Sequence, residues 1–399
     1  MASARTAPPL LREPQWPQLR EAVAAAGGHL GRLDNLLRYV REVVRCVIYA
    51  AVRDGEVAIF APLCAAEFRN SFHARLGPEE VVADLERQCG TDRRRWYLNG
   101  RLLCERPPRG GWGDYLFEEI HGMLREASAH LPRGRLFEFC VNKRDHALVS
   151  SPPGLDPYTL SPLPPALAEA ARNLPPVLGF YTGPNHSDLA MPLPHDRFRT
   201  PPPSSPPSRN GVFFRGGLTG GGLRAWAVGA LHSIARTYGV AVDAGITSVP
   251  RRWKWRSGGG GAMELVPPAR PSSHALVPPV PEAEWGAWRC LIYCDGNAGA
   301  TRWLGMFAHG SVVVEVPDPE CPCPDMWAKQ RMEAGVHYIR AAGPNLEALD
   351  RAIHAALFTT DGQTVAENGR RAHDELMASV RDGSALAEVI LRACSAHAS

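Results

Sequence analysis

The sequence of 399 residues contains no run of about 18 apolar residues, the length that a membrane-spanning helix needs. Its first residues, MASARTAPPLL, have no apolar core of signal-peptide length, and its last residues do not resemble Lys-Asp-Glu-Leu. We therefore expect a cytoplasmic protein with no membrane span, no signal peptide and no retention signal.

The sequence also has little excess charge of either sign. Its 44 basic and 41 acidic residues give a formal net charge of +3, which is too small to indicate a nucleic-acid partner. One basic segment, RRWKWR at 251–256, interleaves tryptophan with arginine and lysine, a pattern that can stack on bases or sugars. A single short patch is weak support. We expect no nucleic-acid partner, and an interaction protein that binds a polyanion through this patch is an alternative.

Paired cysteine spacings typical of metal fingers are missing. The ten cysteines are scattered, and the close pair Cys321 and Cys323 flanks a proline with no second pair beside it. No Asp-x-Asp pair stands where it would indicate a Mn²⁺ site. We expect reduced thiols, no metal and no bound cofactor.

What the sequence does contain is an alternation of strand-like and helix-like patterns, which predicts an α/β fold whose second half is doubly wound. Apolar spacing predicts helices over 15–45, 78–89, 114–131, 223–238, 346–357 and 363–392. Apolar and β-branched runs predict strands at 46–52, 56–60, 136–141, 212–214, 290–294, 312–316 and 336–339. The proline-rich tracts 150–176 and 200–209 are typical of linkers or surface wraps.

The strand at 212–214 runs directly into a glycine-rich turn, and a helix follows from Leu223. This order presents free backbone N–H groups and a positive helix end to a phosphate, and Arg215 and Arg224 bracket the turn with two guanidinium groups. The turn is neither a Walker loop, since Gly-Lys-Ser/Thr is missing, nor a convincing Gly-x-Gly-x-x-Gly fingerprint. A flexible loop without a ligand is the alternative.

A second small-residue loop, from Asp295 to Ala300, precedes Arg302 and the valine-rich run 312–316. Small and turn-forming residues let the backbone approach a ligand closely, and the valine run predicts a parallel strand that is buried on both faces. Arg302 alone is typical of a solvated helix residue. Aimed at the same crevice as Arg215 and Arg224, it would supply a third positive charge for a diphosphate.

Asp145 closes the strand-like run FEFCVNKRD, where a catalytic base would sit facing a ligand of the second domain. A surface carboxylate paired with Lys143 or Arg144 is the alternative, and His146 is expected to be a neighbour. The segment HSDLAMPLP places Ser187 and Asp188 in a proline-bounded stretch. It predicts either a loop that lines a sugar pocket or a turn that Asp188 caps.

Taken in order, these segments resemble glycosyltransferase family 90, which includes Rumi-type protein O-glucosyltransferases and capsule-associated xylosyltransferases. The resemblance covers roughly 137–376. Its elements are Asn-x-Arg-Asp (142–145), Ser-Asp-x-x-x-Pro (187–192), Phe-Arg-Gly with a later Thr and Arg (214–224), Asp-Gly-Asn with Arg302 and His-Gly-Ser-Val-Val (295–313), Trp327, Val-His-Tyr-Ile (336–339), Asn345-Leu346 and Ala-Glu-Asn-Gly (366–369).

The resemblance implies two Rossmann-like domains that face a cleft, the type B glycosyltransferase fold. It implies an amino-terminal acceptor-side domain (1–200), a carboxyl-terminal nucleotide-sugar domain (201–370) and a helical segment (371–399). The implied reaction is inverting and metal-independent. A sugar, with glucose or xylose expected, moves from a UDP-sugar to a hydroxyl of a glycan or protein acceptor.

The resemblance also assigns roles to residues. Asp145 is the implied base that deprotonates the acceptor hydroxyl, with Ser187, Asp188 and His146 on the acceptor or sugar side. The implied donor-binding residues are Arg215, Gly216, Thr219, Arg224, Asp295, Gly296, Asn297 and Arg302.

Two features depart from the family. His146-Ala147 stands where family members commonly have an aromatic residue and proline, and Gly217 stands where Rumi-like proteins have serine. A catalytically silent nucleotide-sugar or glycan-binding protein of the same fold is therefore the alternative function. Without a secretory signal, a microbial or viral enzyme that builds a glycan or modifies its own proteins is expected.

Overall fold

The computed structural model describes residues 11–44, 46–64, 96–98, 101–104, 114–143, 146–197, 206–219, 222–249, 254–257, 263–266 and 276–396. The helix predicted over 78–89 and the proposed base Asp145 lie outside the described residues. Of the basic patch, residues 251–253 also lie outside them, and only the backbone of 254–256 is described.

The amino-terminal half contains a six-stranded sheet in the order β1-β3-β2-β6-β7-β8. Its strands are β1 (Leu11–Arg12), β2 (Cys46–Arg53), β3 (Glu56–Cys64), β6 (Leu136–Asn142), β7 (Val177–Gly179) and β8 (Leu189–Ala190). β2 runs antiparallel to both β3 and β6, whereas the other neighbouring pairs are parallel. The strands predicted at 46–52 and 56–60 are confirmed and form a hairpin, with Asp54 and Gly55 at positive φ in its turn.

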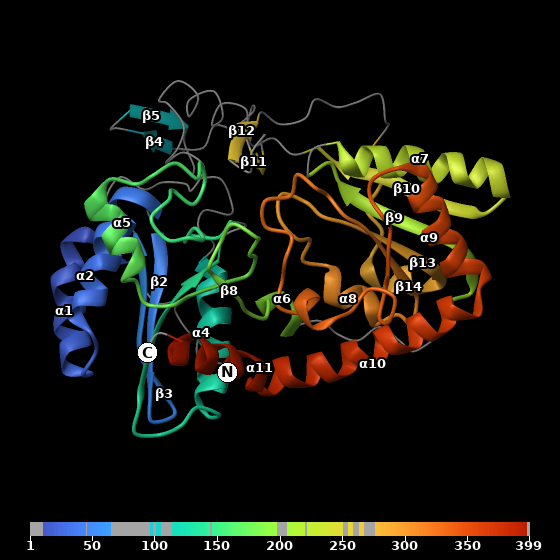
Figure 1. The fold of residues 1–399 in the computed structure, drawn as a ribbon. Coiled ribbons are helices and arrows are strands. Elements are labelled where there is room, and N and C mark those ends of the chain that lie inside the picture. The colour runs from blue at the N-terminus through green and yellow to red at the C-terminus, as the bar shows by residue number, and fades with distance from the viewer. Residues whose placement is uncertain are drawn as a thin grey trace.

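Helices cover both faces of this sheet (Figure 1). One face carries α1 (Trp16–Ala25), α2 (Leu30–Tyr39) with a π-helical turn at Val40–Val44, and α5 (Pro165–Arg172), and the other carries α4 (Asp114–Ser128). The sequence predicted α4 and the helical start of the chain. It did not predict α5, which lies inside the proline-rich tract.

The carboxyl-terminal half contains a five-stranded sheet in which every neighbouring pair is parallel. In sheet order its strands are β10 (Ala241–Ser248), β9 (Arg209–Gly217), β13 (Trp288–Cys294), β14 (Val312–Val316) and β15 (Ile339–Arg340). Every residue of β14 is buried, as its valine content predicts for a central parallel strand. The order 2-1-3-4-5 is that of a doubly wound sheet of the flavodoxin type.

Four helices flank the second sheet: α7 (Leu223–Tyr238), α8 (Trp303–Phe307), α9 (Leu346–Phe358) and α10 (Thr360–Asp382). α7 and α9 pack on one face, against Val212, Phe214 and Ile292, and α8 and α10 lie on the other. α7 spans the residues that the sequence predicted, and Gly239 ends it in the left-handed conformation with φ 65°.

The chain finally returns to the amino-terminal half. α10 crosses the molecule, ends at Gly383 with φ 85°, and leads into α11 (Ser384–Ala396), which packs on α4 and β6 (Figure 1). The proposed domain boundary after residue 370 therefore falls within α10.

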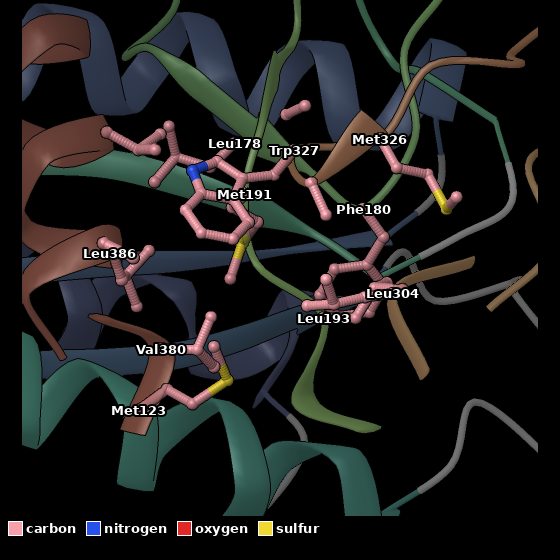
Figure 2. Packing of buried hydrophobic residues seen from close by; sticks show 14 of the residues in the cluster. Met123, Leu178, Phe180, Met191, Leu193, Leu304, Met326, Trp327, Val380 and Leu386 are labelled. Carbon is pink, nitrogen blue, oxygen red and sulfur yellow. The ribbon is translucent and has the colours of Figure 1, made fainter. Parts of the chain in front are cut away.

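A continuous hydrophobic core joins the two halves. It contains Phe139 and Leu178 of the first sheet together with Leu291 and Val313 of the second. Figure 2 shows part of this core, where Trp327 lies beside Met191.

The backbone also joins the halves. Thr182, which follows β7, exchanges two backbone hydrogen bonds with Asp325, with N···O distances of 2.9 and 3.1 Å. A Cβ atom on the adjacent Gly183 would collide with the carbonyl oxygen of Pro322, so only glycine allows this close approach.

The smaller elements are β4 (Trp96–Leu98) paired with β5 (Arg101–Cys104), β11 (Lys254–Ser257) paired with β12 (Met263–Val266), α6 (Pro194–Arg197) and the 3₁₀ helices Glu13–Gln15, Glu282–Ala287 and Lys329–Arg331. Among the described residues, no helix combines the length and the apolar character that a membrane crossing requires. The fold is mixed α/β with two sheets that are rich in parallel pairs.

Candidate functional site

The candidate donor site lies where β9 and β13 end side by side in the second sheet. In a sheet of this order the connections from these two strands leave in opposite directions, which opens a crevice at their carboxyl ends where ligands bind. The glycine-rich turn follows β9, and residues 295–299, hereafter the donor loop, follow β13. Two segments that the sequence singled out separately thus meet at one point.

Arg224 is buried in the first turn of α7 and ties these two segments together. Its Nε donates to the carbonyl oxygen of Asp295 at 3.0 Å and its Nη2 to that of Cys294 at 3.0 Å. Its Nη1 donates to the carbonyl oxygen of Gly217 at 3.0 Å and to Oγ1 of Thr219 at 2.5 Å. Four of the five guanidinium N–H groups are used in this way, so one remains to donate to a ligand.

Arg302 directly precedes α8, and its guanidinium lies beside that of Arg224. Its Nη1 donates to the carbonyl oxygen of Arg215, and its Cζ lies 5.5 Å from the ring centroid of Trp285. A Cβ atom placed on Gly216 would lie 3.2 Å from Nη2 of Arg302 and 3.6 Å from Nη1 of Arg224. The end of β9 is therefore bracketed by two positive groups.

The charge of these two groups is not balanced locally. Among the described residues, no ion pair within 4.0 Å joins either guanidinium to a carboxylate. Asp295 and Glu282 act on Arg224 and Arg302, respectively, only from a greater distance. Burial, and then repulsion from Arg224, lower the pKa of Arg302 to about 10. A site of this kind favours an anionic ligand.

The two segments leave little room for a side chain where they touch. A Cβ atom on Gly296 would lie 3.1 Å from Oγ1 of Thr219 and 3.2 Å from Nη2 of Arg224. Contacts this short force a neighbour to shift, so Gly296 lets the donor loop pack against the turn after β9.

Arg215 points away from this cluster. Its side chain forms an ion pair with Asp243 of β10, and its Nη1 lies 2.6 Å from where a Cβ atom of Gly245 would be. Because successive side chains of a strand alternate, Arg215 faces the side opposite to Phe214 and Gly216. Its Nε and Nη1 have no hydrogen-bond partner within the described part of the chain.

Two further predicted residues lie in the donor loop. The Asp295 carboxylate points inward, where Oδ1 accepts a hydrogen bond of 2.8 Å from the hydroxyl of Tyr293, and burial raises its pKa to about 6. Asn297 is half-buried, and its Oδ1 has no partner among the described residues. Asp295 therefore fixes the loop through Tyr293, whereas Asn297 has a buried acceptor atom that is unpaired within the described ranges.

In the amino-terminal half, the Asp188 side chain holds a loop by accepting hydrogen bonds from the backbone amides of that loop. Its Oδ2 accepts from the amide of Leu148 and its Oδ1 from that of Val149, both at 2.8 Å. Burial raises the pKa of Asp188 to about 7 although these bonds favour its charged form. This geometry is the capped turn that the sequence left as one of two alternatives. The neighbouring Ser187 is exposed, and its hydroxyl donates to the carbonyl oxygen of Ser150 at 3.3 Å.

The loop that Asp188 holds begins directly after the proposed base. Asn142 ends β6, and its Nδ2 donates to the carbonyl oxygen of His146 at 2.6 Å. His146 is buried, with its ring centroid 6.1 Å from that of Tyr158. Asp145 lies between these two residues in the sequence but outside the described residues, so its role stays a prediction.

Sequence reasoning missed two residues of this region, Tyr293 and Lys329. Tyr293 is the penultimate residue of a predicted strand, and its hydroxyl accepts from the amide of Ala300 at 2.7 Å while it donates to Asp295. Lys329 reaches the donor loop from far along the chain. Because Tyr293 lies near the carboxyl end of the strand predicted at 290–294, the sequence could have placed it next to the site. No local pattern indicates the same for Lys329.

No group of three or more His, Cys, Asp or Glu side chains is arranged to hold a metal ion in the described ranges. The expectation of a metal-independent reaction stays a prediction.

No protein-family model matches the chain, and no curated protein matches it. Among solved structures, the chain is similar to one described as "Crystal structure of GtfA/B complex", with 10% sequence identity and a TM-score of 0.35. The match covers 57% of this chain and 47% of the other, so the chain spans about half the length of that structure. A likeness this weak does not establish a shared activity.

Proposed function

We propose that this protein is an inverting, metal-independent glycosyltransferase that uses a UDP-sugar. The observation that carries the proposal is the pair of guanidinium groups, Arg224 and Arg302, at the carboxyl ends of β9 and β13, where no carboxylate of the described residues forms an ion pair with either. A diphosphate bound there would supply the missing negative charge. The ordered motifs in the sequence support the UDP-sugar class.

The two arginines have different parts in this proposal. Arg224 has one N–H group without a partner among the described residues, so it acts mainly by its charge and by fixing the turn and the donor loop. Within the described part of the chain, the Arg302 side chain donates one hydrogen bond to the protein, so its remaining donors are available to the diphosphate.

The proposed reaction is a single displacement. The Asp145 carboxylate takes the proton of the acceptor hydroxyl as its oxygen attacks the anomeric carbon, and the bond from that carbon to the diphosphate oxygen breaks. The electron pair of the broken bond stays on UDP, where Arg302 stabilises the growing charge. One preorganised donor of this kind contributes about 3–4 kcal/mol in comparable sites, and a positioned base about 10²–10⁴ in rate.

The two halves would divide the work between them. The proposed acceptor-side domain (1–200) supplies Asp145, with Ser187 and His146 near the acceptor, and the proposed nucleotide-sugar domain (201–370) supplies the donor site. Glucose and xylose differ by one hydroxymethyl group, so the shape of the sugar pocket decides between them. The proposed partners are a nucleotide sugar and a glycan or protein acceptor.

Turnover tests the proposal. UDP release from UDP-glucose, UDP-xylose, UDP-galactose and UDP-N-acetylglucosamine is measured with and without sugar acceptors for the wild type, Asp145→Asn and Asp54→Asn, a control at an exposed hairpin turn. We expect Asp145→Asn to lose about 10²–10⁴ in transfer rate and to keep UDP affinity. Equal rates for all three proteins would remove Asp145 as the base. UDP binding without turnover of any donor would favour the catalytically silent protein.

A further inference from the structure

A buried lysine lies directly beneath the donor loop. Lys329 is 7% exposed, and its Nζ lies 2.6 Å from Oε1 of Glu315 and 3.7 Å from Oδ2 of Asp295. It also donates to the carbonyl oxygen of Pro324 at 3.3 Å. The two carboxylates are 0% and 1% exposed, respectively, so this is a buried ionic cluster.

Aromatic rings enclose the same ammonium group. Its Nζ lies 5.5 Å from the ring centroid of Tyr293 and 5.6 Å from that of Trp303. Burial lowers the pKa of Lys329, but Asp295 and Glu315 more than offset this effect, so the pKa is raised overall and the side chain is charged. The electrostatic attraction between a desolvated cation and aromatic rings adds to the stabilisation of this ammonium group.

A cluster of this kind fixes geometry. Buried charges are costly unless they are paired, so moving Asp295 away from Lys329 would leave a charge uncompensated. Asp295 also accepts from the hydroxyl of Tyr293, which in turn accepts from the amide of Ala300. One end of the donor loop is thus held through its acidic side chain.

The segment that carries Lys329 holds the other end of the donor loop as well. The amide of Gly299 donates to the carbonyl oxygen of Cys323 at 3.0 Å, and a Cβ atom on Gly299 would lie 2.9 Å from Cγ of Met326. The same segment exchanges two backbone hydrogen bonds with the amino-terminal half through Asp325. Residues 321–329 therefore contact the donor loop and the acceptor-side half at once.

We propose that Lys329 is a positioning residue for the donor site, because its ammonium group holds Asp295, and with it the donor loop, in the arrangement that faces Arg224 and Arg302. That the ligand is UDP rests on the proposed function. That Lys329 fixes the donor loop does not depend on it. Lys329 touches no reacting atom and acts through Asp295.

The test compares four proteins: the wild type, Lys329→Met, Lys329→Met combined with Glu315→Gln, and Arg331→Met. The double variant removes one positive and one negative charge, so the net charge of the cluster is unchanged. It therefore tests the proposal even if the unpaired Glu315 prevents Lys329→Met from folding. The control Arg331→Met removes a cation that lies 4.5 Å from the ring of Trp327 in the same segment and pairs with Glu388, with no contact to Asp295. The two measurements are amide hydrogen exchange of residues 296–300 and calorimetric titration with UDP.

We expect both Lys329 variants to exchange the amides of Gly299 and Ala300 at least tenfold faster than the wild type and to bind UDP at least tenfold more weakly, with Arg331→Met unchanged in both. With a UDP-sugar, the donor KM should rise more than kcat falls. Unchanged exchange in a folded Lys329 variant would overturn the proposal, and so would faster exchange with unchanged UDP affinity. A wild type that does not bind UDP would instead refute the proposed function, and hydrogen exchange alone would then decide whether Lys329 holds the loop.

Discussion

The two halves of the molecule fix the loops at their sheet ends in opposite ways. In the amino-terminal half, the carboxylate of Asp188 accepts from two backbone amides, at Leu148 and Val149. In the carboxyl-terminal half, the guanidinium of Arg224 donates to the carbonyl oxygens of Gly217, Cys294 and Asp295. Each half thus uses one buried ionisable side chain to satisfy backbone groups that would otherwise be orphaned.

The difference lies in the charge that remains. Asp188 leaves its half with a buried carboxyl whose pKa is raised by burial to about 7, and none of its hydrogen-bond partners in the described part of the chain is an acid. Arg224 has Arg302 as a neighbour, so the other half keeps an excess of positive charge at its sheet end. An excess of this kind suits a diphosphate, and the amino-terminal half offers nothing comparable within its described residues.

The largest expected effect comes from removing the guanidinium that joins two strand ends. Arg224→Met leaves several buried backbone acceptors without a donor, so the free energy of unfolding should fall by about 3–5 kcal/mol. Arg302→Met loses the hydrogen bond to the carbonyl oxygen of Arg215 and should cost about 1 kcal/mol. Urea denaturation of both variants checks this order, and equal losses would contradict the structural role of Arg224.

The matching change in the amino-terminal half is Asp188→Ala. It leaves the amides of Leu148 and Val149 unsatisfied, so the free energy of unfolding should fall by about 2–4 kcal/mol. The control is Ser187→Ala, at the exposed neighbouring residue, for which a change within about 0.5 kcal/mol is expected. Urea denaturation measures both variants. If Asp188→Ala loses no more free energy of unfolding than Ser187→Ala does, Asp188 does not hold this loop.

The contact between the halves gives a smaller effect. Gly183→Ala would place a methyl group against the carbonyl oxygen of Pro322, so the backbone must shift, at a cost of about 1–3 kcal/mol. Gly229→Ala in α7 is the matched control, since no atom lies within 4 Å of its Cβ position. The control should gain up to about 1 kcal/mol from helix propensity. If thermal unfolding shows Gly183→Ala as stable as the wild type, the close contact between the halves is wrong.

The smallest expected effect is a difference in pH dependence between Asp188 and Asp295. Burial raises both pKa values, from 3.8 to about 7 and about 6, so the native state binds each proton more tightly than the unfolded chain does. Each carboxyl therefore contributes stability that falls as pH rises from about 4 to its native pKa, with a slope below about 1.4 kcal/mol per pH unit.

Denaturation of Asp188→Asn and Asp295→Asn from pH 4 to 8 measures this difference. The stability of the wild type relative to Asp295→Asn should stop falling near pH 6, and relative to Asp188→Asn near pH 7. A relative stability that rises with pH over this range would show that the carboxyls are held in their charged form.

Much of the fold could be predicted from local pattern. The valine run of β14 and the apolar spacing of α7 predicted those elements at their observed bounds, because burial on both faces and one apolar stripe leave clear signals. β10 was missed, since its edge position tolerates polar residues such as Asp243. The helical stretch predicted over 363–392 is two helices, since Gly383 breaks it in a left-handed conformation.

The candidate site could be predicted only in part. The local sequence pattern indicates where a residue lies along the chain, but not which way its side chain points in the fold. The sequence grouped Arg224, Arg302 and Gly296 in one site, and the structure also places these residues close together. It grouped Arg215 with them, although strand alternation turns that side chain toward Asp243. Lys329 escaped prediction because its contact with Asp295 joins segments far apart in the chain.

Calorimetric titration with UDP and with uridine tests the central claim most directly. The proteins are the wild type, Arg302→Met and Arg209→Met, a control at the opposite end of β9, where the guanidinium lies 5.1 Å from the ring of Trp288. We predict that the wild type binds UDP more tightly than uridine, and that Arg302→Met weakens UDP about tenfold to hundredfold while uridine binding and the control stay unchanged. Equal affinities for UDP and uridine, or an Arg302→Met variant that binds UDP as the wild type does, would contradict the account.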